Sequence, residues 1–296
     1  MATPIGHRGD LSPRAVESLR AADLVMAEDT RTARALLREL GIAVPVRSCF
    51  DGNEAARAAE VAALLRDGKS VALVSEAGTP ALSDPGFRVV RAAVDAGARV
   101  VPVPGPSAVL AALVGSGLPT DRFLFAGFPP RKEGARLGLF ASLRPWPWTL
   151  VLYESPRRAA ATLADLAAAL GGDRRACVAR ELTKTHEELV RGTLRELADR
   201  YQAARPLGEV TLVVAGAGPG ASAGHDGDRA DTLTADSSEL LADRARALLA
   251  QGRSPRDVAR ELAAQTGVPR REVYQIVTSL RTSGTLRRTG SKSESR

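Results

Sequence analysis

The chain has 296 residues, which is long enough for two modest domains, each with its own hydrophobic core. No apolar run approaches the roughly 20 residues that a membrane helix needs, and Met1-Ala2-Thr3-Pro4 lacks the charged-then-apolar pattern of a secretory signal. We therefore expect a cytoplasmic protein with no membrane partner. The net charge of +7 suits an anionic partner such as nucleic acid, although many soluble proteins carry a basic surface without binding one.

Short apolar runs alternate with helical patterns over residues 1–110. The predicted strands are 23–27, 44–46, 71–74 and 100–103, and the predicted helices are 14–19, 32–40, 53–66 and 86–96. Strands that alternate with helices in this way are typical of a parallel α/β sheet.

A second α/β domain is predicted over residues 111–216. Its strands are 123–125, 149–153, 176–179, 188–191 and 209–215, and a single helix, 157–170, lies among them. Because three of the later strands follow one another without long helices between them, we expect a mixed sheet in this domain.

The C-terminal third is predicted to hold a linker, a small helical domain and a tail. Residues 217–238 are rich in Gly, Ala, Ser and Asp without periodicity, which predicts a flexible linker. Helical patterns at 239–249, 255–265 and 270–280 predict a helix-turn-helix-like domain over 239–281, with Ser254 as the N-cap before Pro255. Such a domain either contacts nucleic acid or packs as a plain helical pair. The basic tail, 282–296, is expected to be disordered.

Small or charged residues follow nearly every predicted strand. The clusters are Glu28-Asp29-Thr30-Arg31, Ser75-Glu76-Ala77-Gly78-Thr79-Pro80, Ser83-Asp84-Pro85-Gly86, Pro104-Gly105-Pro106-Ser107, Tyr153-Glu154-Ser155-Pro156 and Arg180-Glu181-Leu182-Thr183-Lys184-Thr185. A turn explains any one of them, but all fall at the carboxyl ends of strands, where open α/β sheets bind their ligands. The sequence has no G-x-G-x-x-G or G-x-x-x-x-G-K-[ST] motif. A nucleoside without phosphates is therefore favoured over a dinucleotide or a triphosphate.

These clusters, with Thr3-Pro4-Ile5-Gly6 ahead of them and Arg157-Arg158 after the fifth, have the order and spacing of one known family. Over about residues 1–215 the chain resembles the bacterial small-subunit ribosomal RNA (cytidine-2′-O)-methyltransferase I family, within the tetrapyrrole-methylase-like superfamily. The resemblance implies a two-domain α/β fold with S-adenosylmethionine between the domains, a homodimer, and a decoding-region cytidine of 16S rRNA as substrate. It also implies that the cofactor lies near Thr3, Glu76, Ala77, Thr79, Pro80, Ser107, Tyr153, Glu154 and Leu182.

The chain departs from the family at three places. A complete strand usually precedes the Thr-Pro-Ile-Gly motif, whereas only Met1 and Ala2 precede it here. We expect a stub of that strand, from a misassigned start or a truncated chain, and a lower stability than that of an extended chain. His7 stands where the family usually has Asn. Phe50-Asp51-Gly52 replaces a region that often carries two histidines, which excludes a histidine base there.

The identity of the catalytic base stays open at this point. Methyl transfer from a sulfonium depends above all on holding the 2′-oxygen in line with the methyl group, and a base that removes the hydroxyl proton would help. The candidates are Glu28, Asp29, Glu181 and Lys184; the lysine acts as a base only if its pKa is lowered, and otherwise contacts an RNA phosphate. Arg31 is expected either to bind a phosphate or carboxylate or to orient Glu28 or Asp29 through an ion pair.

No metal is expected. The three histidines show no metal-ligand spacing with each other or with cysteine. The two cysteines, Cys49 and Cys177, lie in short apolar stretches, so we expect both to be reduced and buried.

Three other readings compete with an rRNA methyltransferase. One is a tetrapyrrole methylase of cobalamin or siroheme synthesis, or a diphthine synthase; the basic balance, the Glu-Leu-Thr-Lys motif and the C-terminal helices argue against it. Another is a DNA-binding regulator whose α/β part senses a nucleoside. A third is an inactive rRNA-binding paralogue.

Overall fold

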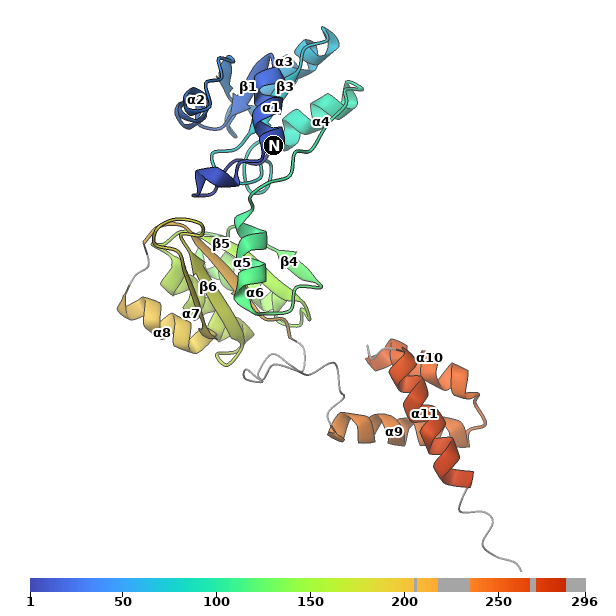
Figure 1. The fold of residues 1–296 in the computed structure, drawn as a ribbon. Helices are drawn as coiled ribbons and strands as arrows, with labels where there is room; N and C mark the ends of the chain where they lie inside the picture. The colour runs from blue at the N-terminus through green and yellow to red at the C-terminus, as the bar shows by residue number, and fades with distance from the viewer. Residues whose placement is uncertain (205–206, 218–234, 267–269, 286–296) are drawn as a thin grey trace, which may run out of the picture. The chain divides into compact units, whose positions relative to one another are not determined.

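The computed structural model describes residues 1–204, 207–217, 235–266 and 270–285, and the chain forms two compact units, Met1–Ala223 and Gly224–Arg296 (Figure 1). The first unit holds two α/β subdomains: the N-terminal subdomain (residues 1–107) and the second subdomain (residues 108–217). The second unit is helical.

A three-stranded parallel sheet forms the centre of the N-terminal subdomain. Its strands are β1 (Leu24–Ala27), β2 (Val46–Ser48) and β3 (Val71–Val74), in the order β2-β1-β3. The short 3-10 helix η1 (Arg8–Asp10) and the helices α1 (Pro13–Ala21), α2 (Thr30–Glu39), α3 (Glu54–Arg66) and α4 (Phe87–Asp95) complete it. Residues of β1 pack alternately against α1 and α2 on one face and α3 and α4 on the other, so the whole strand is buried. The predicted parallel sheet is confirmed.

The fourth predicted strand, 100–103, is absent from this sheet, and that prediction was wrong. Val100 and Val101 are exposed, and the Val103 carbonyl accepts one hydrogen bond, from the Ala2 N–H at 3.3 Å. One bond is too few for a strand ladder. The N-terminal residues make isolated backbone contacts beside β3. The Met1 amino group donates to the Leu73 carbonyl at 2.8 Å, and Thr3 pairs antiparallel with Gly78.

Strand β2 begins two residues later than predicted because of Pro45. The Pro45 carbonyl accepts a hydrogen bond from the Val25 N–H, but proline has no N–H to return. Cys49 follows this strand, and both Cys49 and Cys177 are buried and free, as predicted.

The second subdomain holds a mixed five-stranded sheet, as predicted. Its strands are β4 (Phe123–Phe125), β5 (Thr149–Glu154), β6 (Arg175–Arg180), β7 (Glu188–Thr193) and β8 (Val210–Val214), in the order β4-β5-β8-β6-β7. Only the β4–β5 pair is parallel. Four helices accompany the sheet: α5 (Ala108–Ser116), α6 (Glu133–Leu143), α7 (Ala159–Leu170) and α8 (Leu194–Ala203).

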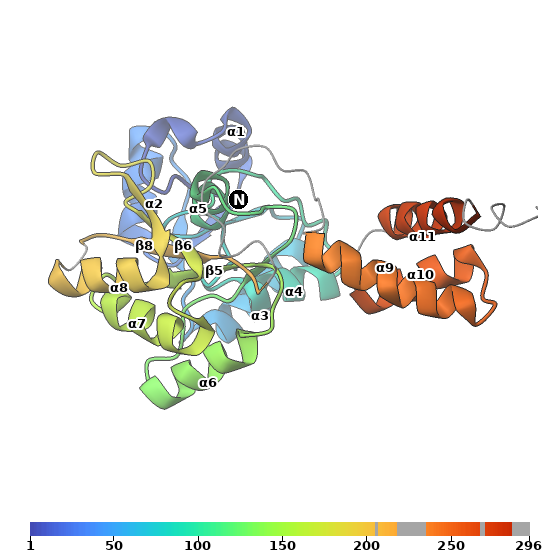
Figure 2. The ribbon, with the colours of Figure 1, turned by 90° about the horizontal axis from the view of Figure 1, so that it is seen from below.

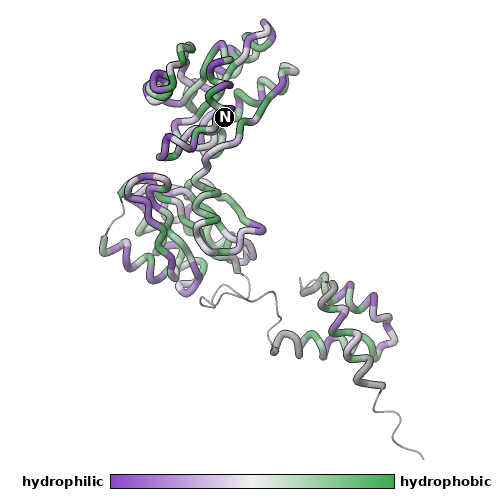
Figure 3. The backbone as a smooth tube through the Cα atoms, in the orientation of Figure 1, coloured by the Kyte–Doolittle hydropathy of each residue, from purple (hydrophilic) through white to green (hydrophobic). Residues whose placement is uncertain are grey.

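The prediction of a single helix among these strands was wrong, because α6 and α8 were missed. Figure 2 shows α6, α7 and α8 side by side, and their apolar faces cover one face of the sheet. The alternation of hydrophobic and hydrophilic residues along the helices is visible in Figure 3. Helix α8 starts with a capping box between Thr193 and Glu196.

The other face of this sheet packs against α5 and against the N-terminal subdomain. Val151, Cys177 and Val213 of the sheet lie in one cluster with Val109 and Leu113 of α5. Ile5 and Leu182 are buried in the same cluster, so the two subdomains share a core. Because α5 packs on the second sheet, the boundary between the subdomains lies near residue 107, a few residues before the predicted 110.

The helical unit packs α9 (Ala235–Ala250), α10 (Pro255–Thr266) and α11 (Arg270–Thr285) around one core. The Ser254 hydroxyl accepts from the Asp257 N–H at 3.2 Å, which confirms the predicted N-cap of α10. Two boundaries differ from the prediction, since α9 begins inside the predicted linker and α11 continues four residues into the predicted tail. Residues 218–234 of the linker and 286–296 of the tail lie outside the described residues. None of the helices in the described ranges is long and apolar enough to cross a membrane.

Candidate active site

Three carboxylates of the N-terminal subdomain interact at the carboxyl ends of its strands. Glu28 follows β1, Glu76 follows β3, and Asp84 lies in the loop that leads to α4. Partial burial, and then the charges of Glu28 and Glu76, raise the pKa of Asp84 to about 6, although a hydrogen bond from Ser75 opposes the shift. Burial, followed by the charges of Glu76, Asp51 and Asp29, also raises the pKa of Glu28. A cation bound here would relieve this mutual repulsion.

Hydroxyl groups connect the loops around these carboxylates. The Thr3 hydroxyl donates to the Ser75 carbonyl at 3.3 Å, and the Thr79 hydroxyl donates to the Pro106 carbonyl at 3.2 Å. Gly78 has φ +78°, and an added Cβ would lie 3.3 Å from the Ile5 side chain. The predicted cofactor residues Thr3, Glu76, Ala77, Thr79, Pro80 and Ser107 therefore lie on loops that contact one another. A pocket lined by Thr3, Arg8, Ser75 and Glu76 with apolar side chains lies beside them.

Two loops of this region hold left-handed residues that are not glycine. Ala81 and Ser83 have φ of 64° and 69°, and Glu181 and Thr183 have φ of 50° and 64°. The residue between each pair is a leucine, Leu82 or Leu182, that packs in the shared core. Each such conformation costs about 1–3 kcal/mol and persists only where the surroundings enforce it, most often at functional sites.

The loop after β6 brings the second subdomain to the site. The Lys184 ammonium donates to Glu181 Oε1 at 2.9 Å and to Glu209 Oε2 at 3.1 Å. An added Cβ on Gly6 would lie 2.5 Å from Lys184 Cγ, and the His7 N–H donates to Thr183 Oγ1 at 3.0 Å. The two subdomains are therefore in direct contact at this loop.

The pKa shifts of Lys184 and Glu181 argue against either residue as the catalytic base. Partial burial on its own would lower the pKa of Lys184, but the hydrogen bonds and charges of Glu181 and Glu209 together raise it. The condition for a lysine base is therefore not met. The pKa of Glu181 is lowered by the Glu209 backbone N–H and then by Lys184. Lys184 as a phosphate contact stays a prediction.

Lys184→Ala is expected to weaken RNA binding and to leave cofactor binding unchanged. Loss of one phosphate contact reduces affinity for every RNA sequence and lowers the slope of log Kd against log salt by about 1. Fluorescence anisotropy at several salt concentrations measures that slope. Lys69→Ala is the matched control, because Lys69 forms an exposed ion pair with Asp23. An unchanged slope in Lys184→Ala would remove this residue from the RNA contact.

Asp29 and Arg31 form a pair at the start of α2. Asp29 accepts the Arg31 backbone N–H and its guanidinium, each at 2.7 Å. The hydrogen bonds from Arg31 hold the pKa of Asp29 at about 2, which makes it a weak base. Arg31, whose side chain is largely exposed, forms an ion pair with Asp29, and the charge of Glu76 also raises the pKa of Arg31. A phosphate or carboxylate contact of Arg31 stays a prediction.

Tyr153 and Glu154 end β5 and have different surroundings. The Tyr153 ring contacts Phe125 and Phe128, with centroids 4.9 and 5.4 Å apart. Burial, and then the charge of Asp84 from the N-terminal subdomain, raise the pKa of Tyr153. The Glu154 side chain, in contrast, is fully buried.

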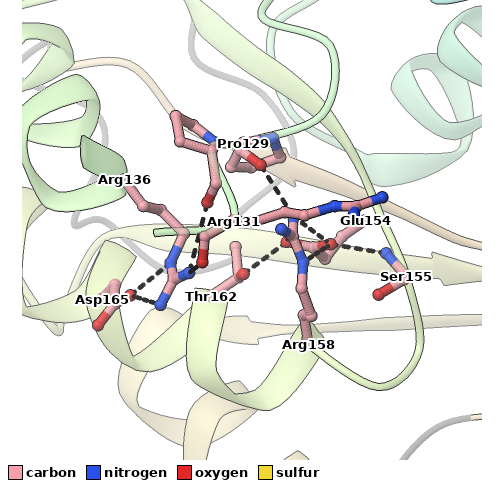
Figure 4. A network of polar contacts seen from close by, with 9 residues as sticks. Pro129, Arg131, Arg136, Glu154, Ser155, Arg158, Thr162 and Asp165 are labelled. Atoms are coloured by element: carbon pink, nitrogen blue, oxygen red, sulfur yellow. Dashed lines mark hydrogen bonds and ion pairs between the residues drawn. The ribbon is translucent and has the colours of Figure 1, made fainter. Parts of the chain in front are cut away.

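Figure 4 shows that the Glu154 carboxylate is bound within the protein. It accepts hydrogen bonds from Arg158, from the Ser155 N–H at 2.7 Å and from the Thr162 hydroxyl at 2.6 Å. The carboxylate is therefore not free to bind a cofactor, so a cofactor-binding role for Glu154 would have to use other atoms. The raised pKa of Asp84 could not be foreseen from the sequence, since Ser83-Asp84-Pro85-Gly86 also fits a turn.

Within the described ranges, no three His, Cys, Asp or Glu side chains are placed to hold a metal ion.

Comparisons with known proteins agree with this architecture. The family of Tetrapyrrole (Corrin/Porphyrin) Methylases matches residues 2–198, and the RsmI C-terminal HTH domain matches residues 234–281. The ribosomal RNA small subunit methyltransferase I of Synechocystis sp. is 44% identical over 284 residues, covering 96% of this chain and 98% of that protein. The chain belongs to the ribosomal RNA small subunit methyltransferase I family. The same-named protein of Mesorhizobium japonicum is 46% identical over 96% of this chain and 92% of its own length, and that of Mycobacterium tuberculosis strain H37Rv is 46% identical over 93% and 92%.

Solved structures place the family's fold among the tetrapyrrole methylases. A uroporphyrin-III-C-methyltransferase from Thermus thermophilus aligns with a TM-score of 0.52 at 22% identity, over 72% of this chain and 91% of that one. The methyltransferase CobJ aligns with a TM-score of 0.53 at 20% identity, over the same shares. At these identities the likeness shows the fold alone, and it confirms the predicted α/β architecture.

Proposed function

We propose that the chain transfers a methyl group from S-adenosylmethionine to the ribose 2′-hydroxyl of a decoding-region cytidine in 16S rRNA. It would act as a homodimer on small ribosomal subunits in the cytoplasm. The observation that carries the proposal is the junction between the subdomains. There the charges of Glu28 and Glu76 raise the pKa of Asp84, and the charge of Asp84 in turn raises the pKa of Tyr153 of the second subdomain. The chain's relatives are named ribosomal RNA small subunit methyltransferase I.

The residues present fit a positively charged methyl donor. S-Adenosylmethionine carries a sulfonium and supplies an already activated methyl group, so the protein has to bind and orient it. The carboxylates of Glu28, Glu76 and Asp84 repel one another, and a cation would relieve that repulsion. We therefore assign the donor to the loops that carry Thr3, Glu76, Ala77, Thr79, Pro80 and Ser107, with Tyr153 and Leu182 opposite.

The proton acceptor is best sought among the carboxylates with raised pKa. A carboxylate whose pKa lies near neutral is a better base than one whose pKa is held at about 2, as that of Asp29 is. Asp84, with a pKa of about 6, meets this requirement, and Glu28 is the alternative.

Deletion of residues 235–296 is expected to weaken binding of the small subunit while leaving binding of the methyl donor unchanged. The helical unit has its own core, around Val258, Leu262 and Val273, so its removal leaves the first unit intact. Calorimetric titration with the donor and filter binding with the subunit measure the two affinities separately. Equal subunit affinity with and without the helical unit would contradict an RNA-binding role for it.

Methyl transfer from radiolabelled donor to several acceptors tests the proposal. Label is expected in small subunits that lack the modification, and neither in large subunits nor in a tetrapyrrole acceptor. Label in the tetrapyrrole alone would favour a tetrapyrrole methylase. A shifted DNA duplex without any methyl transfer would favour a regulator, and donor binding without transfer to any acceptor would favour an inactive paralogue.

A further inference from the structure

The loop that follows β4 presents an exposed aromatic ring beside the candidate active site. Phe128 is 58% exposed, although phenylalanine is usually buried. It follows Gly127, which has φ +64° and whose carbonyl accepts the Tyr153 N–H at 3.0 Å. Phe128 therefore leaves the sheet next to the end of β5.

Two largely buried ion pairs hold the backbone of this loop through hydrogen bonds to its carbonyl groups (Figure 4). The Arg158 guanidinium, paired with Glu154, donates to the Pro129 carbonyl at 2.9 Å. The Arg136 guanidinium, paired with Asp165, donates to the Arg131 carbonyl at 3.2 Å and to the Pro130 carbonyl at 3.4 Å. Two successive prolines restrict the backbone further. The loop is therefore fixed in a conformation that leaves the ring exposed.

The Phe128 ring contacts Tyr153, a residue of the candidate active site. Its centroid lies 5.4 Å from that of Tyr153, in a tilted arrangement. The charge of Asp84, in turn, raises the pKa of Tyr153. A group that stacks on Phe128 would thus lie next to the junction of the two subdomains.

Two cations follow the ring in the sequence. Arg131 and Lys132 are exposed, and Lys132 is one of only four lysines in the chain. An aromatic ring beside exposed cations is the usual arrangement for binding single-stranded nucleic acid, because the ring stacks on a base and the cations contact phosphates.

We propose that Phe128 is the platform on which an unpaired base of the acceptor RNA stacks, while Arg131 and Lys132 contact the adjacent phosphates. This inference rests on the proposed function and names how its RNA substrate is held. A stacked base positions its neighbouring ribose beside Tyr153, where the 2′-hydroxyl can be presented to the carboxylates of the N-terminal subdomain.

Substitution of Phe128 tests the proposal in the full-length protein. Phe128→Ala should weaken binding of unmethylated small subunits about five- to hundredfold, as loss of one base–aromatic stack does. Phe128→Trp should restore binding, because it keeps a stacking surface. The salt slope should stay unchanged in Phe128→Ala and fall by about 1 in Arg131→Ala or Lys132→Ala.

Phe123→Ala is the matched control. Phe123 is the first residue of β4, whereas Phe128 follows the end of that strand; Phe123 is 37% exposed and pairs with Thr149 at the start of β5. It should bind the small subunit as the wild type does. Calorimetric titration should give the same donor affinity for all these variants, since the ring is assigned to the RNA.

Wild-type RNA affinity in Phe128→Ala would overturn the proposal. If donor binding were weakened at the same time, the ring would be assigned to the donor's adenine. A wild-type protein that binds small subunits but transfers no methyl group would end the proposed function, while the stacking site would still stand or fall on the Phe128 binding data. A wild-type protein that binds no small subunit would contradict both.

Discussion

Asp84→Asn is expected to lower the turnover number about 10²- to 10⁴-fold, the usual contribution of a general base. In the proposed step, a carboxylate oxygen of Asp84 takes the proton of the ribose 2′-hydroxyl. The 2′-oxygen bonds to the methyl carbon of the donor, the carbon–sulfur bond breaks, and its electron pair stays on sulfur. Asparagine keeps the size of the side chain and cannot accept that proton, so donor affinity should change far less than turnover.

The same substitution is expected to raise the melting temperature at about pH 8. The pKa of Asp84 rises from 3.8 in a model peptide to about 6 in the folded protein, because burial and then Glu28 and Glu76 disfavour its ionised form. The folded state therefore binds this proton more tightly than the unfolded state, and stability is lost as pH rises from 3.8 to about 6. Asp84→Asn removes that loss, so its advantage should vanish below about pH 4. A purely structural aspartate would give a lower melting temperature instead.

Glu28→Gln is the control for this assignment. It removes one of the charges that raise the pKa of Asp84, so the acidic limb of the pH–rate profile should move to lower pH. Turnover on the alkaline side should remain. Loss of turnover at every pH in Glu28→Gln, with activity kept in Asp84→Asn, would identify Glu28 as the base.

Glu154→Ala is expected to lower the free energy of unfolding by about 3–5 kcal/mol, the cost of leaving a buried charge without its partner. The Glu154 side chain is fully buried, and its removal leaves the Arg158 guanidinium and the Thr162 hydroxyl without their acceptor. Urea denaturation measures the effect. The loop that carries Phe128 should loosen as well, because Arg158 also holds the Pro129 carbonyl.

Asp95→Ala is the matched control for the ion pair. Asp95 pairs with Arg91 one helical turn away, and both side chains are more than half exposed. Exposed pairs of this kind contribute about 0.3–0.5 kcal/mol. Equal losses in Glu154→Ala and Asp95→Ala would show that burial of Glu154 adds nothing to stability.

Most of the elements predicted from the sequence have a clear period or a fully apolar run, although the amphipathic helix α8, with its capping box, was missed. Strand β1 was predicted because four consecutive apolar residues are buried on both faces of a parallel sheet. Helix α5 was missed because it is apolar on nearly every side, which removes the helical period. The run at 100–103 looked like a strand because its composition is right, but pairing depends on a neighbour that a local pattern cannot reveal.

The loops that the sequence assigned to the site contact one another in the structure, whereas the roles of their residues stay predictions. The clusters after β1, β3 and β6 do lie near one another, as the rule for open α/β sheets predicts. The role of Asp84 depends on its distance from Glu28 and Glu76, which the sequence does not contain. Glu154 ends a strand as a ligand residue would, but its acceptor atoms are used by Arg158, Ser155 and Thr162.

Mapping the transferred methyl group to a single atom tests the central claim most directly. Labelled small-subunit rRNA would be digested to nucleosides and the labelled product analysed by mass spectrometry, with alkaline hydrolysis in parallel. The account predicts label on the ribose 2′-oxygen of one cytidine and resistance of the adjacent phosphodiester bond to alkali. Label on a base atom, with that bond still cleaved by alkali, would contradict it.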